Sequence, residues 1–335
     1  MSTSMKRSRP RGTVLVTGGA GYIGSHATHA LADAGWRIVV LDNLSTGRRD
    51  AVAPEADLIE GDLEDAALLR TILTSRAVDA VMHFAASVVV PESVTDPLKY
   101  YRNNTRNTLG LIEACVACGV RRVIFSSTAA VYGAPDAPMV SENTPTAPIN
   151  PYGRSKLLSE QMLGDVAATG ALSYVALRYF NVAGADPQGR TGQSTPGATH
   201  LIKVACETVL GRRPQLSVFG TDYDTPDGTC VRDYIHVADL IGAHMAALER
   251  LMDGGESLTL NCGYGRGYSV REVLAAVAAA ADRPVPTVDA ARRPGDPPML
   301  IADSARLART LGWTPRHADL DAIVRSALEW ERRLT

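Results

Sequence analysis

The sequence has 335 residues, of which 45% are hydrophobic and 21% charged, and a formal net charge of −2. This composition is typical of a soluble globular protein, and the length favours one large α/β unit with a smaller lobe. The small net charge gives no reason to expect nucleic acid or an anionic membrane as a partner. No apolar run approaches the roughly 18–20 residues that a membrane span needs.

The five cysteines favour free thiols in a cytoplasmic protein over a disulfide framework, because their number is odd and their spacing irregular. They are Cys115, Cys118, Cys206, Cys230 and Cys262. Cys115 and Cys118 have no second pair and lie in an apolar helical run, so we interpret them as core residues. The sequence therefore predicts no metal site.

The chain begins with a basic stretch that we expect to be a disordered tail over residues 1–11. The apolar run that follows, Val14–Gly19, is too short and too rich in glycine for a signal peptide.

From Thr13 to Arg178, short apolar runs alternate with longer amphipathic stretches. The apolar runs are Thr13–Thr17, Arg37–Leu41, Asp57–Glu60, Ala80–Phe84, Arg122–Ser126 and Tyr174–Arg178. The helical stretches are Ile23–Ala34, Ala66–Ser75, Leu98–Cys118 and Tyr152–Thr169. This α/β alternation predicts a doubly wound parallel sheet covered by helices on both faces, which is the Rossmann architecture.

After Phe180 the alternation ends. Two long polar loops, 186–197 and 220–228, are accompanied by helices predicted at His236–Met252, Val270–Ala281 and Leu320–Arg332. Loops of this length in a compact protein are more often functional than not. We expect a Rossmann domain over residues 12–180, completed by later segments near 232–262. Residues 181–335 are expected to form mainly a smaller C-terminal substrate-binding lobe.

A glycine-rich turn lies between the first strand and the first helix. Gly18 and Gly21 permit a tight turn and close approach of a pyrophosphate to the positive helix end, and Gly24 permits helix–strand packing. Asp42 ends the second strand, where a carboxylate can hold a ribose 2′-hydroxyl and repel a 2′-phosphate. Asp62, after the third strand, is placed to bind the adenine edge. The pattern predicts a dinucleotide site that prefers NAD to NADP.

Tyr152 and Lys156 are four residues apart in a predicted helix and so lie on one face. A phenol with a pKa near 10 is a poor base at neutral pH, but a neighbouring ammonium and a cationic nicotinamide favour the phenolate. Lowering the phenol pKa by about 3 units corresponds to about 4 kcal/mol. Thr128, at the carboxyl end of the fifth strand, can complete a Thr–Tyr–Lys group around a substrate alcohol.

These motifs resemble those of the extended short-chain dehydrogenase/reductase family and, within it, the UDP-glucose 4-epimerases. The resemblance runs from Thr13 to Trp330 and is carried by segments 16–26, 41–44, 83–86, 97–104, 150–156 and 177–181. Its most specific parts are Asp-Gly-Thr-Cys-Val-Arg-Asp-Tyr-Ile-His-Val (227–237) and Arg-Arg-Pro-Gly-Asp (292–296).

The resemblance implies reversible inversion of carbon 4 of a UDP-hexose (UDP-glucose or UDP-galactose) through a transient 4-keto sugar and bound NADH. By position, Tyr152 would take the proton from the 4-hydroxyl, Thr128 would hydrogen-bond that oxygen, and Lys156 would bind the nicotinamide ribose and tune Tyr152. The positions matching family cofactor contacts are Gly18, Gly21, Tyr22, Ile23, Gly24, Asp42, Asn43, Asp62, Leu63, Phe84, Ala85, Ala86, Asn103, Tyr152, Lys156 and Phe180. Val88 departs from the lysine of some members, which predicts weaker cofactor retention.

For the UDP-sugar, the resemblance implies contacts from Thr128, Asn181, His200, Leu201, Phe219, Arg232, Arg293, Asp296 and Leu300. Arg232 and Arg293 suit a diphosphate, because a guanidinium presents a bidentate fork to phosphate oxygens. A tyrosine at the position of Leu300 goes with hexoses that lack an N-acetyl group. The smaller leucine therefore predicts that UDP-GlcNAc and UDP-GalNAc are also substrates, and a UDP-pentose remains an alternative.

Three other functions compete on the same scaffold. A dehydratase typically needs an acid pair directly after the strand-end threonine, where this chain has Ala129 and Ala130, so its general acid and base would be missing. A dehydrogenase that releases NADH is opposed only by the resemblance of the substrate half. A non-catalytic dinucleotide sensor is opposed by the intact Thr128, Tyr152 and Lys156.

Two further expectations concern assembly and histidines. Family members pair through two helices per subunit, here near 97–118 and 152–169, so we expect a homodimer. His83 and His236 are interpreted as structural hydrogen-bonding residues.

Overall fold

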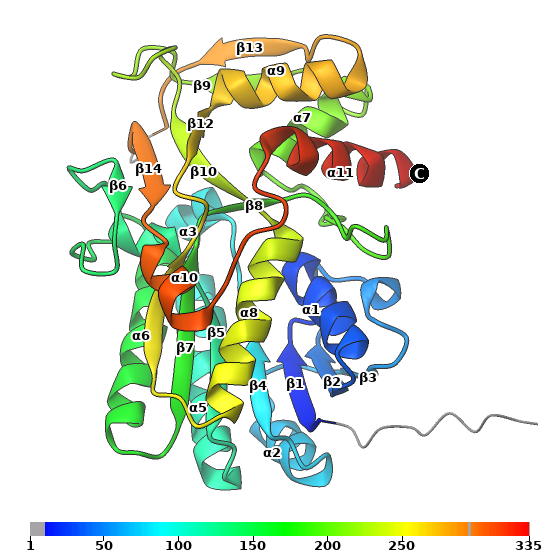
Figure 1. Cartoon of the computed structure of the whole chain (residues 1–335), viewed down its shortest axis with the longest axis vertical. Helices are drawn as coiled ribbons and strands as arrows, with labels where there is room; N and C mark the ends of the chain where they lie inside the picture. Colours follow the sequence, from blue (N-terminus) through cyan, green and yellow to red (C-terminus); the bar gives the residue numbers. More distant parts are fainter. Residues whose placement is uncertain (1–10, 294–295, 335) are drawn as a thin grey trace, which may run out of the picture.

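A seven-stranded parallel sheet forms the centre of the computed structural model, which describes residues 11–293 and 296–334 (Figure 1). The predicted tail therefore lies, apart from Arg11, outside the described residues. The strand order is β11-β7-β5-β4-β1-β2-β3. The strands are β1 (Thr13–Thr17), β2 (Arg37–Asp42), β3 (Asp57–Glu60), β4 (Ala80–His83), β5 (Arg122–Thr128), β7 (Ser173–Tyr179) and β11 (Leu258–Cys262). This order, which reverses direction between β1 and β4, confirms the predicted doubly wound Rossmann architecture.

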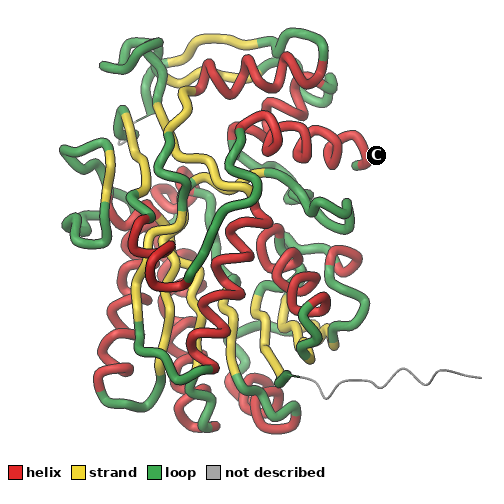
Figure 2. Tube along the Cα trace, viewed as in Figure 1, coloured by secondary structure: helices red, strands yellow, loops and turns green. Residues whose placement is uncertain are grey.

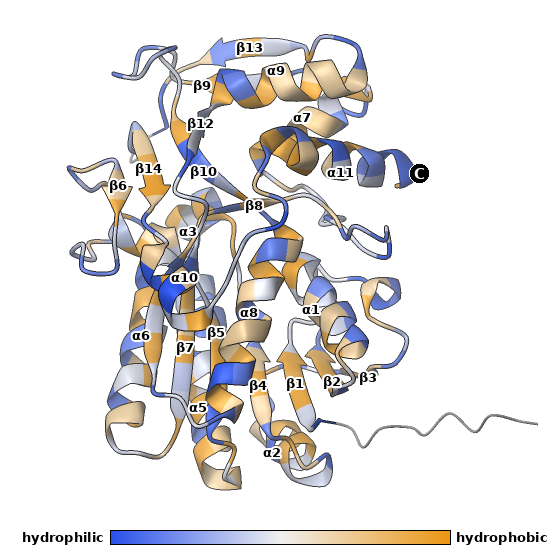
Figure 3. Ribbon diagram, viewed as in Figure 1, coloured by the Kyte–Doolittle hydropathy of each residue, from blue (hydrophilic) through white to orange (hydrophobic). Residues whose placement is uncertain are grey.

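Helices cover both faces of this sheet. On one face lie α1 (Tyr22–Asp33) and α8 (Val237–Met252). On the other lie α2 (Ala66–Ser75), α5 (Asn107–Cys118) and α6 (Pro151–Ala168). Val14 and Val16 of β1 pack with the first pair of helices, and Leu15 between them packs with the second group. Because successive strand side chains point to opposite faces, a doubly covered strand is mainly apolar, as the colours of β1 and β2 show (Figure 3).

The predicted helix over 98–118 is interrupted, which corrects the sequence interpretation. It begins as the short helix α4 (Pro97–Tyr100), continues as a π-helical segment over Tyr101–Arg106, and becomes α5 only at Asn107. The short helix α3 (Val90–Thr95) precedes it. π-Helical turns are rare and often lie at functional sites.

The smaller lobe lies above the carboxyl ends of the central strands (Figures 1 and 2). Its sheet contains β12 (Gly267–Ser269), β10 (Val231–His236), β14 (Met299–Ala302), β6 (Met139–Val140) and β8 (Asn181–Ala183). A separate pair is formed by β9 (Leu216–Phe219) and β13 (Thr287–Ala290). Around these strands lie α7 (Leu201–Val209), α9 (Val270–Ala281) and α11 (Leu320–Arg333), which share an apolar core. The remaining helices are α10 (Ala305–Leu311) and short 3-10 turns at Arg49–Ala51 and Ala129–Tyr132.

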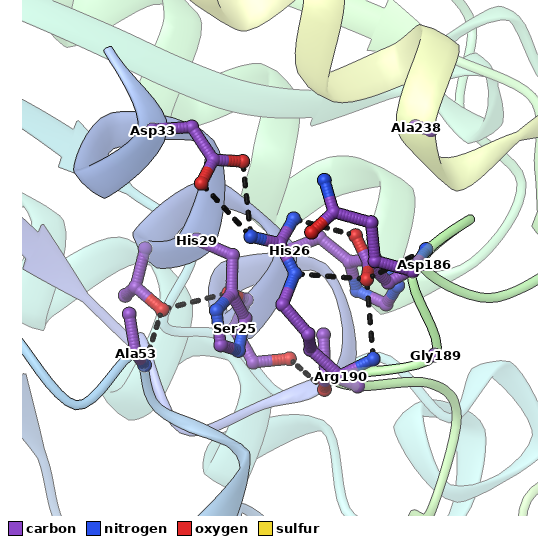
Figure 4. A network of polar contacts seen from close by, with 12 residues as sticks. Ser25, His26, His29, Asp33, Ala53, Asp186, Gly189, Arg190 and Ala238 are labelled. Carbon is purple, nitrogen blue, oxygen red and sulfur yellow. Dashed lines mark hydrogen bonds and ion pairs between the residues drawn. The ribbon is translucent and has the colours of Figure 1, made fainter.

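A segment over residues 184–194, which we call the strap, ties α1 to α11. Arg190 of the strap donates to both carboxylate oxygens of Asp33 at the end of α1, at 2.9 and 3.0 Å (Figure 4). On the other side, Trp330 of α11 donates its indole N–H to Ser194 at 3.2 Å. The strap therefore connects the helix that follows the glycine-rich turn to the C-terminal helix of the lobe.

Two further properties concern the chain as a whole. No helix within the described residues is long and apolar enough to cross a membrane. All five cysteines are free, and four of them are buried.

Candidate functional site

The glycine-rich turn has backbone geometry that only glycine satisfies. Gly18 has φ +71°, and a Cβ there would lie 2.6 Å from the backbone nitrogen of Ala85. A Cβ on Gly24 would lie 2.1 Å from the Gly18 carbonyl oxygen. Gly21 is the N-cap of α1 and offers no side chain to cap it. The positive end of α1 is thus left uncapped at a closely packed turn, as a pyrophosphate site requires.

Asp42, which ends β2, and Asp62, which follows β3, both accept hydrogen bonds from other groups of the protein. The Asp42 carboxylate accepts hydrogen bonds from the backbone N–H groups of Ala20 at 2.9 Å and Leu44 at 2.8 Å. Asn43 donates to Asp62 at 2.8 Å. Asp42 therefore holds the turn in shape, in addition to the ribose role predicted for it. Leu63, which follows Asp62, is buried in the core under α2.

The segment over residues 84–87, which follows β4, forms another side of the site. The backbone N–H groups of Phe84 and Ala85 donate to the Thr17 carbonyl at 3.0 and 3.1 Å, which holds the 84–86 segment against the end of β1. Asn103 lies on the π-helical segment and donates to the Ser87 hydroxyl at 2.9 Å.

The adjacent Asn104 is a feature that sequence reasoning missed. It is buried, accepts a hydrogen bond from the Ser87 backbone at 2.8 Å and donates to the Ser155 hydroxyl at 3.0 Å. Ser155 lies between Tyr152 and Lys156 in the chain. The π-helical segment thus fixes the position of α6 relative to the 84–87 segment.

Helix α6 begins where its sequence predicts and buries the two candidate catalytic residues. Asn150 caps it by accepting from the Gly153 backbone at 2.8 Å, and Pro151 fits the first helical position. Tyr152 and Lys156 are 7% and 3% exposed. They lie on one face of the helix, one turn apart.

The electrostatic setting of the pair is dominated by burial. Burial raises the pKa of the Tyr152 phenol, and a hydrogen bond with Thr128 lowers it. Burial lowers the pKa of the Lys156 ammonium to about 7, while the Glu160 carboxylate raises it. The ammonium lies 4.5 Å from the centre of the Phe125 ring. Within the described residues it makes no hydrogen bond or ion pair, so its N–H groups are available to a bound ligand.

His83 lies behind the site with both ring nitrogens engaged. Nδ1 is 2.7 Å from the Thr17 hydroxyl and Nε2 is 2.9 Å from that of Thr108. Burial, with a smaller effect from Lys156, lowers the pKa of His83 to about 3. His236 likewise accepts from the Ala238 backbone at 3.0 Å. These contacts agree with the structural roles predicted for both histidines.

The predicted phosphate-binding arginines lie in the smaller lobe. Arg232 of β10 lies 3.6 Å from Asp296, and in the sheet it stands opposite Leu300 of β14. The Arg293 guanidinium lies over the ring of Phe219, 3.8 Å from its centre. The structure therefore places Arg232 beside Asp296 and Arg293 against Phe219, and all four residues were predicted to bind the substrate.

The other predicted substrate residues are distributed around this group. Leu300 is buried and belongs to the same apolar cluster as Phe180 and Ala129. Asn181 begins β8, and Leu201 begins α7. His200 is exposed and lies 2.9 Å from Gln193; no hydrogen bond or ion pair within the described part of the chain joins it to Arg232.

Sequence reasoning also missed a buried ion pair that involves Glu160, one turn after Lys156 on α6. Arg178 of β7 donates to the Glu160 carboxylate of α6 through Nε at 3.0 and 3.1 Å and through Nη2 at 2.6 Å. The Ser127 hydroxyl donates to the same carboxylate. The only signal available was the charged residue in an otherwise apolar strand and a glutamate four residues after Lys156.

Comparison with known proteins identifies the family. A model of the NAD dependent epimerase/dehydratase family matches residues 14–263. The chain belongs to this family.

Full-length relatives carry a narrower description. A UDP-glucose 4-epimerase of Azospirillum brasilense is 61% identical over 99% of this chain and 95% of its own. The crystal structure of the Brucella ovis UDP-glucose 4-epimerase in complex with NAD has a TM-score of 0.92 and 49% identity, covering 95% of this chain and 98% of its own. The UDP-Glc/GlcNAc 4-epimerase of Campylobacter jejuni has a TM-score of 0.84 and 48% identity, covering 96% and 99%. The chain is therefore similar to these enzymes over both the Rossmann part and the lobe.

Proposed function

We propose that the protein is an NAD-dependent UDP-glucose 4-epimerase that interconverts UDP-glucose and UDP-galactose. The observation that carries this proposal is the buried Tyr152–Lys156 pair, with Thr128 beside it, in a chain 61% identical to a UDP-glucose 4-epimerase along almost its whole length. An isolated Rossmann fold would not support it, since one fold hosts many functions.

The residues of the site fit NAD, and we assign them the following roles. When bound, NAD supplies the hydride acceptor and donor of the reaction. The uncapped end of α1 at Gly21 would hold the pyrophosphate, and Asp42 the ribose. The Lys156 N–H groups would bind the nicotinamide ribose, and their charge would favour the Tyr152 phenolate.

At the sugar, Tyr152 would take the proton from the 4-hydroxyl and later return it. Thr128 would hydrogen-bond the same oxygen. Arg232 and Arg293 would hold the diphosphate, which fixes the nucleotide while the sugar presents either face. Ala129 and Ala130 follow Thr128 directly and supply no acid or base for dehydration.

We propose three broader features on the same basis. The described segment up to Phe180, together with α8 and β11, acts as the NAD-binding domain, and most of the remaining chain forms the UDP-sugar-binding lobe. The enzyme is cytoplasmic, a proposal supported by its free cysteines. It works as a homodimer paired through α5 and α6.

A second activity, on UDP-N-acetylhexosamines, is favoured by Leu300. This residue is 8% exposed and lies in the apolar cluster with Ala129 and Phe180. Leucine leaves more room than tyrosine would, and the Campylobacter jejuni relative is described as acting on both Glc and GlcNAc.

The deciding experiment is incubation of the purified protein with UDP-glucose, without added nicotinamide, followed by proton NMR of the sugar. Appearance of UDP-galactose without lasting NADH absorbance establishes epimerisation with retained cofactor. Activity that requires added NAD indicates loose retention, as predicted from Val88. Accumulating NADH would replace the proposal with a dehydrogenase, and turnover of UDP-pentoses alone would redirect it to that substrate.

The matched control is Tyr152→Phe. We expect this variant to bind UDP as the wild type does but to lose at least about 10³-fold in rate, because the base is removed while the ring remains. Undiminished turnover would exclude Tyr152 as the base.

A further inference from the structure

Glu160 is a buried carboxylate one helical turn beyond Lys156. The two residues stand at i and i+4 on α6, so they lie on the same face of the helix. Glu160 is 5% exposed, and Arg178, its partner on β7, is 7% exposed. A buried carboxylate is costly unless it is paired and hydrogen-bonded.

The contacts of Glu160 hold its carboxylate in place. Both of its oxygens accept hydrogen bonds from Arg178, whose Nη2 lies 2.6 Å from Oε2, and Ser127 adds a hydroxyl donor. Hydrogen bonds to the charged form of a carboxylate favour that form. Glu160 is thus a paired and hydrogen-bonded carboxylate between α6 and β7.

Lys156 needs such a charge, because it is buried and makes no ion pair within the described residues. The groups that act on it are Glu160 of its own helix, His83 of β4 and the ring of Phe125 of β5. Ser127 and Arg178 contact Glu160, and Thr128, Tyr100 and Tyr179 act on Tyr152. His83 is neutral near pH 7, and of the charged groups it is Glu160 that raises the pKa of Lys156.

We propose that Glu160 is a positioning residue whose charge keeps the Lys156 ammonium protonated, so that Lys156 can stabilise the Tyr152 phenolate during catalysis. The inference rests on the proposed epimerase function. Arg178 and Ser127 act one step further away, by holding the Glu160 carboxylate in place.

The direct test is a pH titration of Lys156 in protein labelled with 13C at the lysine side chains, without substrate. The resonance is assigned by its loss in Lys156→Met. In Glu160→Gln, which keeps the shape of the side chain and removes its charge, we expect the pKa of Lys156 to fall by about one unit. Glu160→Asp keeps the charge on a shorter side chain and should leave the titration close to that of the wild type.

The kinetic test is the alkaline limb of the pH–rate profile with UDP-glucose. In Glu160→Gln the limb should shift to lower pH by about one unit, a loss of about tenfold in rate on that side. A purely structural role predicts the opposite order, because the shortened Glu160→Asp should then be the more damaged variant. Coincident limbs or titrations in the wild type and Glu160→Gln would overturn the proposal.

Glu160→Gln leaves Arg178 buried without its partner and for that reason can fail to fold. A second variant keeps the proposal testable in that case. Glu160→Gln combined with Arg178→Met removes the pair together. It should fold and still shift the Lys156 titration downward, by less than the single variant. A double variant that titrates as the wild type does would overturn the proposal. Absence of epimerase activity in the wild type would instead overturn the proposed function, and the NMR titration would still decide the role of Glu160.

Discussion

Lys156 is a site residue whose burial opposes folding. Its ammonium is 3% exposed, and its pKa is lowered to about 7 by burial despite the opposing effect of Glu160. A buried cation without a direct partner opposes folding, and here it is retained beside the phenol that it would activate. Active sites often keep such strain because function depends on it.

This cost predicts that removal of the charge stabilises the NAD-free protein at acidic and neutral pH. Below pH 7 the residue is charged in both folded and unfolded states, so the full cost is present. Between pH 7 and its unfolded pKa near 10.4, the folded state loses the proton first and the cost falls. Lys156→Met should therefore unfold in urea with a free energy higher by on the order of 3 kcal/mol at pH 6, with little gain near pH 10.

The matched control for this prediction is Lys99→Met. The Lys99 side chain is 44% exposed, so its replacement should change the unfolding free energy little at either pH. A gain in Lys156→Met that is equal at pH 6 and pH 10 would show that apolar packing, and not the loss of charge, is responsible.

Leu300 sets a second prediction at the scale of one side chain. Leu300→Tyr should lower the rate with UDP-GlcNAc, relative to that with UDP-glucose, by at least about tenfold, because a larger ring occupies space needed by the N-acetyl group. Parallel kcat/KM measurements on both substrates check it, with the volume-conserving Leu300→Met as control. If the tyrosine variant keeps the wild-type ratio, pocket size at this position does not select the substrate.

The residues that could be predicted are those whose role depends on neighbours in sequence. Tyr152 and Lys156 are one helical turn apart, and Gly18, Gly21 and Gly24 share one turn. The partnership of Glu160 with Arg178 could not be predicted in this way, because it depends on how α6 lies against β7. Sequence periodicity places each residue on a face but does not say which residue faces it across an interface.

At the scale of elements, most boundaries followed from hydropathy, and the exceptions have physical causes. The α2 and α9 bounds match the predictions. The π-helical segment over Tyr101–Arg106 carries no hydropathy signal that separates it from an α-helix, and it is distinguished by tertiary hydrogen bonds of Asn103 and Asn104. The segment containing β11 was expected to join the Rossmann domain, but it was not assigned as a strand, because its short run lies far along the chain from its partner β7.

The guanidinium of Arg190 contacts both Asp33 of α1 and Asp186 of the strap itself. Arg190 donates to Asp186 through Nε at 2.9 Å and through Nη2 at 2.8 Å, in addition to its contact with Asp33. Burial would raise the pKa of the Asp186 carboxyl, but hydrogen bonds from the side chain and backbone of Arg190 hold it below its usual value. The Asp186 side chain is 8% exposed, and that of Asp33 is 53% exposed.

We expect Arg190→Met to lower the unfolding free energy by about 2 kcal/mol at pH 7, because it leaves the Asp186 charge buried without its partner. Asp33→Asn should cost less than about 0.5 kcal/mol, because that pair is exposed. Asp186 stabilises the fold above its unfolded pKa near 3.9, and this contribution is lost as pH falls through its lower folded pKa. Urea titrations should therefore find the effect of Arg190→Met at pH 7 and a smaller one near pH 3; equal losses in both variants would contradict this account.

At the scale of the whole molecule, the architecture was predictable because repeated βα alternation restricts a chain to few topologies. The set of strands that form the sheet of the lobe could not be predicted. This sheet takes β6 from residues 139–140, before α6, and β14 from residues 299–302. Predicted cofactor residues lie at the carboxyl ends of β1, β2 and β4, and β10, which carries Arg232, lies in the lobe above the central sheet (Figure 1). In doubly wound folds ligands bind outside the carboxyl ends of the strands, so this arrangement supports the proposed binding of both ligands between the two parts.

The outer surface of α3–α6 carries exposed apolar side chains that no described element covers. They are Val90, Val94, Leu98, Leu109, Val116 and Leu158, with exposures from 38% to 64%. Leu109 and Val116 are seven residues apart on α5 and therefore share a face. Large apolar side chains that are exposed on neighbouring helices are typical of a subunit interface.

The proposed homodimer predicts a mass of twice one 35.6-kDa chain by light scattering at micromolar concentration. Leu109→Glu combined with Leu158→Glu should yield a monomer, because a two-fold interface would bring the new charges of both subunits into one buried surface. The control is Val288→Glu, at a 39% exposed apolar residue on β13 of the lobe, which should remain dimeric. A monomeric wild type would exclude the dimer, and a dimeric double variant would place the interface elsewhere.

Pairing also bears on activity, because α6 carries both Tyr152 and Lys156. The monomer should lose activity if pairing stiffens that helix. Full activity of a stable monomer would show that each subunit works alone.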